Sequence, residues 1–201
     1  MKAQIFSVLL LIGATVLFSC NDSSTVTEES IETAENQLPV VDEEENADML
    51  KPSTFLTLKL LRSTFSLAEA DQIERMDSDG KCSYDWSKDN KNYHVDFQFY
   101  FPGEMDDDRC TKMYEQLTNG YTQEKDKPVA LEGVGTKAIF SKLGGGQLIV
   151  RHENEILILN MSVIDLEGFK NLGETDDAVQ KDLMEKGSNM AKSIIQLLDR
   201  P

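Results

Sequence analysis

Two side chains of this sequence have the types and spacing of an acid/base pair. His94 and Asp96 are two residues apart in a stretch where apolar and polar residues alternate, so both lie on the polar face of one predicted strand. A histidine beside a carboxylate can transfer protons in catalysis. The solvated face of a sheet gives the same pattern and is the interpretation that we favour. A hydrolytic enzyme using His94 and Asp96 is the third of three functional hypotheses.

Other catalytic and metal-binding patterns are lacking. The two histidines, His94 and His152, are far apart in the sequence and give no zinc-ligand spacing. The stretch 77–80 resembles a calcium loop, but the residues at the first and last ligand positions of such a loop are unsuitable. Gly144-Gly145-Gly146 lacks the Lys-Ser/Thr that follows in a phosphate-binding loop, and we interpret it as a turn. We therefore expect no catalytic residue, no metal and no cofactor.

The elements that position these residues predict an α+β fold. Apolar spacing near three to four indicates one helix or two short ones within 52–71, and further helices at 106–119 and 175–198. Alternation or short apolar runs indicate strands at 81–87, 93–101, 137–141, 147–153 and 156–163. We expect an antiparallel sheet of about five to six strands with the helices gathered on one side.

Charge divides the chain at about residue 50. Residues 21–50 contain ten acidic residues and no basic one, which predicts a disordered acidic tether after Cys20. Residues 51–201 contain 19 basic and 26 acidic residues, a net charge of −7, and we expect them to form a single domain. This balance argues against nucleic-acid binding, which requires clustered Lys and Arg.

The N-terminus has the features of an export signal. Lys2 precedes an apolar run from Ile5 to Phe18, too short to span a membrane, and Leu17-Phe18-Ser19-Cys20 closes it. This sequence resembles the lipobox of bacterial lipoproteins. The resemblance implies that residues 1–19 are a signal peptide and that Cys20 becomes an acylated N-terminus holding the protein on a membrane of the cell envelope. Asn21 differs from the aspartate that retains such proteins at the inner membrane, so we favour the outer membrane and leave the leaflet open.

A second resemblance concerns the domain. The strand Cys82-Ser83-Tyr84-Asp85-Trp86, the turn at 132–138, the hairpin at 148–163 and the closing helix are similar to small envelope lipoproteins with a PsbP-like sandwich. The similarity covers roughly residues 55–198. It implies an α+β sandwich that acts as a binding or accessory module, and it transfers no catalytic residue.

With Cys20 lipidated, Cys82 and Cys110 remain in an exported protein. Each lies on the apolar side of its predicted strand or helix, so a disulfide joining helix to sheet is expected, with two buried free thiols as the alternative. Closing a loop of about 29 residues would stabilise the fold by roughly 3 to 4 kcal/mol in the chain-entropy model.

Three functions are consistent with these features. The leading hypothesis is a membrane-anchored, non-enzymatic binding or accessory module for another envelope or extracellular protein. The alternative is a small-molecule or carbohydrate-binding lipoprotein that uses Tyr84, Trp86, Tyr93 and Tyr100. It requires several of these rings to be exposed together in a pocket.

Overall fold

The computed structural model describes residues 50–78, 80–123 and 127–200, apart from the side chains of 122 and 123. These residues belong to one compact unit. The predicted signal peptide, Cys20 and the acidic tether up to residue 49 lie outside the described residues. Within the described part of the chain, no helix is both long enough and apolar enough to cross a membrane.

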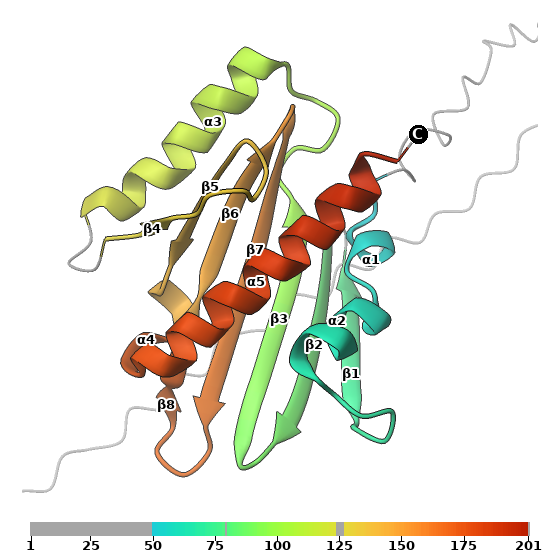
Figure 1. Ribbon diagram of the computed structural model, residues 1–201, viewed down its shortest axis with the longest axis vertical. Coiled ribbons are helices and arrows are strands. Elements are labelled where there is room, and N and C mark those ends of the chain that lie inside the picture. Colours follow the sequence, from blue (N-terminus) through green and yellow to red (C-terminus); the bar gives the residue numbers. More distant parts are fainter. Residues whose placement is uncertain (1–49, 79, 124–126, 201) are drawn as a thin grey trace, which may run out of the picture. The chain divides into compact units, whose positions relative to one another are not determined.

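Eight strands form one antiparallel sheet (Figure 1). They are β1 (Ile73–Ser78), β2 (Lys81–Lys88), β3 (Lys91–Phe99), β4 (Val129–Ala130), β5 (Lys137–Ser141), β6 (Gln147–His152), β7 (Glu155–Asp165) and β8 (Lys170–Asn171). Their order is β1-β2-β3-β7-β6-β5-β4, and β8 pairs with β7. The α+β class is confirmed, and the sheet is wider than expected because β1, β4 and β8 were not predicted. β1 is almost fully exposed and charged, and β4 and β8 contain two residues each, so none carries a periodic apolar signal.

The described residues also form seven helical segments. They are α1 (Pro52–Phe55), α2 (Leu58–Phe65), α3 (Asp107–Asn119), α4 (Leu172–Thr175) and α5 (Asp177–Leu198), with two 3₁₀ turns, η1 (Gly120–Gln123) and η2 (Leu143–Gly145). The stretch 52–71 therefore contains two short helices and not one. Asp106 and Asp176 begin α3 and α5 by accepting hydrogen bonds from backbone amides of the first turn, which is the favoured role of aspartate at that position.

Two hydrophobic cores lie on opposite faces of the sheet. The larger one joins α1, α2 and α5 to residues such as Phe97 and Leu159, and α5 crosses the sheet diagonally in Figure 1. The smaller one joins α3 to Ile149, Ile156 and Ile158. The expectation that all helices gather on one side is wrong. Because Ile158 and Leu159 are neighbours that point to opposite faces, an apolar strand such as β7 requires cover on both sides.

Candidate functional site

His94 and Asp96 contact each other on β3. His94 Nε2 lies 3.1 Å from Asp96 Oδ2, and His94 Nδ1 lies 2.8 Å from Asp85 Oδ1 on β2. Both nitrogens of the imidazole therefore face carboxylates. This arrangement fits a doubly protonated imidazolium between two anions, because each nitrogen then donates a hydrogen bond.

Asp96 is the centre of a larger polar cluster. Its side chain is only 5% exposed, and Lys81 Nζ lies 2.9 Å from its Oδ2. Its other oxygen, Oδ1, accepts a hydrogen bond from Asn160 Nδ2 at 2.8 Å. This buried carboxylate is therefore held by two cations and an amide, which offsets the cost of removing its charge from water.

The cluster continues across the sheet toward α3. Gln147 Nε2 donates to Asn160 Oδ1 at 2.5 Å, and the hydroxyl of Tyr121, in η1, donates to Gln147 Oε1. We call this hydrogen-bonded set the polar row; its members are Lys81, Asp85, His94, Asp96, Tyr121, Gln147 and Asn160.

Strand register creates the polar row. Asp96 lies directly opposite Ser83 on β2 and Asn160 on β7, and Asn160 lies opposite Gln147 on β6. Directly opposed side chains on one face of a sheet are close enough to bond. Our sequence reasoning missed Asn160 and Gln147. Each is a polar residue in a mostly apolar strand, on the face of the sheet that packs against α3. A polar residue within an apolar run was the one feature of the sequence that could have indicated them.

The cluster shifts the pKa values of its two central groups in opposite directions. The hydrogen bond to Asp96 raises the pKa of His94; burial opposes this shift, and Asp85 reinforces it. Burial alone would raise the pKa of Asp96, but hydrogen bonds from His94, Asn160 and Lys81 outweigh it and lower that pKa. Both shifts favour the charged forms.

We expect stability to depend on pH through this pair. A raised His94 pKa contributes stability that is fully present below the unfolded value of about 6.5 and is lost as pH rises through the folded value. A lowered Asp96 pKa contributes stability that is present above about 3.9 and is lost as pH falls through the folded value. In urea unfolding from pH 3 to 9, the His94–Asp96 pair should therefore contribute most to the free energy of unfolding between about pH 4 and 6.5. In the variant His94→Asn, the decrease in stability above about pH 6.5 should become smaller. An unchanged decrease would contradict its assignment to His94.

A pocket of about 330 Å³ lies beside the polar row. Its wall includes His94, Asp96 and Asn160, together with the exposed Leu143 of η2. The α3 core on this face includes side chains of β5, β6 and β7 but none of β1, β2 or β3. Among the polar-row residues of β2 and β3, Lys81, Asp85 and His94 are partly exposed and can contact a partner, whereas Asp96 is buried.

The four predicted ligand-contact aromatics do not share this pocket. Tyr84 is buried in the larger core and donates its hydroxyl hydrogen bond to the Leu56 carbonyl oxygen. Trp86 is 5% exposed and stacks on Tyr93, with ring centres 5.1 Å apart. Tyr100 packs against the smaller core on the opposite face. Trp86 and Tyr93 do line a separate open pocket of about 620 Å³, but their rings are largely engaged with each other.

The expected Cys82–Cys110 disulfide is absent from the structure. Both cysteines are buried free thiols, and they belong to different cores, Cys82 with α5 and Cys110 with α3. The sheet separates them. Each cysteine does lie on an apolar side of its element. Because both faces of the sheet are buried, however, the two apolar sides can face different cores, and here they do. Burial raises the pKa of the Cys82 thiol to about 11 and also raises that of Cys110, which makes both poor nucleophiles.

Comparison with protein-family models, curated proteins and solved structures finds no match to this chain.

Proposed function

We propose that this chain is a lipid-anchored, non-enzymatic binding module of a bacterial cell envelope, and that the polar row is its contact surface for another protein. Cys20 would carry the acyl anchor, and residues 21–49 would hold the domain away from an outer-membrane surface. The proposal deepens the expectation drawn from the lipobox and from the PsbP-like resemblance.

The observation that carries the proposal is the polar row, in which Lys81, Asp85 and His94 are partly exposed. Its side chains bond to one another across β2, β3, β7 and β6, so they are held in place before a partner binds. A preorganised surface loses less conformational entropy on binding than a mobile one. Lys81 and His94 balance the charges of Asp85 and Asp96, which favours a neutral polar surface on the partner.

The same geometry argues against acid/base catalysis. A catalytic histidine uses one nitrogen to exchange a proton with substrate while a carboxylate orients the other. In His94 both nitrogens bond to carboxylates, so neither is free for a substrate. The raised pKa further favours the protonated ring, which cannot act as a base.

A small polar ligand is the second candidate, because the 330 Å³ pocket lies within the usual size range of ligand sites. Amide and hydroxyl groups of Gln147, Asn160 and Tyr121 could hydrogen-bond such a molecule. Stacking on a sugar ring has less support, since Tyr84 and Trp86 are buried.

Site-specific photocrosslinking tests the proposal. The full chain is produced in intact bacteria with benzoylphenylalanine in place of Leu143, which is 56% exposed and lines the pocket. We expect a protein adduct, identified by mass spectrometry, that is lost when Ser162→Arg fills the pocket. The matched control is Ser63→Arg on the exposed surface of α2, and it should retain the adduct.

Two further results separate the alternatives. Cys20→Ala should move the protein from the membrane to the soluble fraction and reduce the adduct, because the anchor is removed. An adduct that is equally strong in Ser162→Arg and Ser63→Arg would contradict the polar row as the contact surface. Absence of any protein adduct, with a small molecule recovered from the purified chain, would favour the second candidate.

A further inference from the structure

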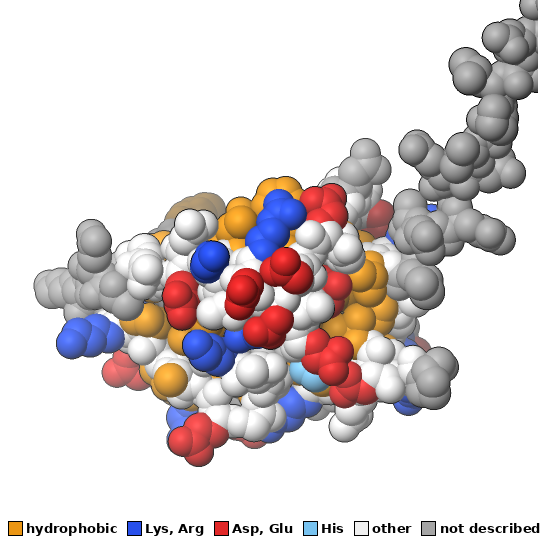
Figure 2. All heavy atoms as spheres, turned by 90° about the horizontal axis from the view of Figure 1, so that it is seen from above, with side chains coloured by type: hydrophobic (Ala, Val, Ile, Leu, Met, Phe, Trp, Pro, Cys, Tyr) orange, Lys and Arg blue, Asp and Glu red, His pale blue; other side chains and the backbone are white. Residues whose placement is uncertain are grey.

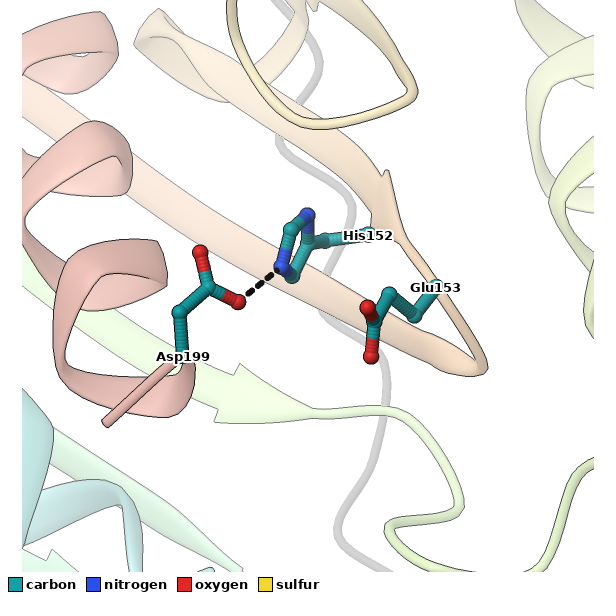
Figure 3. A group of neighbouring side chains, drawn as sticks. All are labelled: His152, Glu153 and Asp199. Carbon is teal, nitrogen blue, oxygen red and sulfur yellow. Dashed lines mark hydrogen bonds and ion pairs between the residues drawn. The ribbon is translucent and has the colours of Figure 1, made fainter. Parts of the chain in front are cut away.

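Three potential metal ligands meet at one end of the sheet, away from the polar row. His152 ends β6, Glu153 follows it in the turn to β7, and Asp199 lies just after α5. One ligand atom of each lies within 4.8 Å of the other two. Figure 3 shows the three side chains pointing toward one another from these two parts of the fold.

We propose that His152, Glu153 and Asp199 form a binding site for a divalent transition-metal ion, with Zn²⁺ as the best fit. An imidazole nitrogen and two carboxylate oxygens are ligands of the types that zinc accepts, and a water molecule completes a tetrahedral shell. The proposal is independent of the binding function of the polar row.

The distances suit such an ion after small side-chain movements. Zinc–ligand bonds of about 2.0 to 2.2 Å place tetrahedral ligand atoms roughly 3.4 Å apart. His152 Nε2 and Asp199 Oδ1 are 2.7 Å apart and would separate slightly to admit the metal. The Asp199 side chain is 53% exposed and Glu153 is also exposed, so both carboxylates can rotate, whereas the His152 side chain is only 16% exposed.

Charge also favours a divalent cation. The two carboxylates bring two negative charges to one small region, and among the described residues no lysine or arginine forms an ion pair with either of them. Figure 2 shows several acidic side chains gathered on one face of the domain, with Lys and Arg side chains among them. A cluster of like charge raises the local concentration of cations.

A bound metal would join two distant segments of the chain. Asp199 is 47 residues from His152, and α5 packs on β6 in the larger core. The ion would therefore fasten the C-terminal end of α5 to the β6–β7 turn. Because this arrangement exists only in the folded chain, metal binding should stabilise the fold.

Calorimetric titration of the full chain with ZnCl₂, after removal of metals with a chelator, tests the site. We expect one ion per chain and a rise in melting temperature on zinc addition. His152→Ala and Glu153→Gln should each weaken binding by about tenfold or more, the scale seen when ligand shells are disturbed. Glu185→Gln removes an exposed carboxylate in the middle of α5 and should bind zinc as the unmodified chain does.

Three results would overturn the proposal. The first is absence of zinc binding by the folded chain, with folding checked by circular dichroism. The second is equal affinity in Glu153→Gln and Glu185→Gln. The third is loss of binding in His94→Gln with retention in His152→Ala, which would place the metal at the polar row instead.

Discussion

Replacing Asp96 with alanine should lower the free energy of unfolding by about 3 kcal/mol. The carboxylate is nearly inaccessible, and it bonds to Lys81, His94 and Asn160 at 2.9, 3.1 and 2.8 Å. Alanine removes all three interactions at once; Lys81 and Asn160 lose this acceptor, and His94 keeps only Asp85. Urea unfolding of the purified chain at pH 6, where both Asp96 and His94 favour their charged forms, measures the effect.

Asp85→Ala is the matched control on the same histidine. Asp85 bonds to His94 Nδ1 at 2.8 Å, but its side chain is 36% exposed, so water can replace the lost interaction. We expect a loss below about 1 kcal/mol for this variant. Equal losses in Asp85→Ala and Asp96→Ala would show that Asp96 is not the centre of the polar row.

Gly173→Ala should destabilise the fold by about 3 kcal/mol, although alanine is normally the better helix former. Gly173 lies in α4 against η2, and a Cβ built on it would overlap the carbonyl oxygen of Gly145. The obstructing atom belongs to the backbone, so a side-chain rotation cannot relieve the overlap. Thermal and urea unfolding of the variant measure the loss.

Gly120→Ala is the control for this substitution. Gly120 follows α3 with a right-handed helical backbone, φ −56°, and a Cβ there would meet no atom within 4 Å. We expect no loss, or a gain of up to about 1 kcal/mol, because alanine restricts the unfolded chain. If Gly173→Ala unfolds like Gly120→Ala, α4 and η2 are not in close contact. η2 borders the 330 Å³ pocket. If Gly173→Ala displaces η2, it should therefore also reduce photocrosslinking at position 143.

Regular elements were predictable where local periodicity was strong. The strand expected at 137–141 coincides with β5, and the expected helices at 106–119 and 175–198 match α3 and α5 within two residues. β1 was missed because its sequence, Ile-Glu-Arg-Met-Asp-Ser, has no buried face. A strand at the edge of a sheet need not have a buried face, and charged side chains on it discourage pairing with other chains.

The candidate site was only partly predictable. The i and i+2 spacing of His94 and Asp96 placed them on one strand face, and they do bond. Asn160 could not be connected to Asp96 in the same way, because 64 residues separate them and their contact depends on the register of β3 with β7. The Cys82–Cys110 prediction was wrong for a related reason, since alternation shows that a side chain is buried but not on which side of the sheet.

Periodicity and charge in the sequence alone indicated the α+β class, the alternating faces of β2 and β3, and the separation of an acidic N-terminal stretch. These properties depend on residues close together in the chain. The lipid anchor at Cys20, implied by the resemblance to the lipobox, stays a prediction. Only the tertiary structure assembled the polar row, divided the apolar residues between two cores, and brought Asp199 to His152. Strand register and helix placement are set by packing between distant segments, and that information is not contained in any local window of sequence.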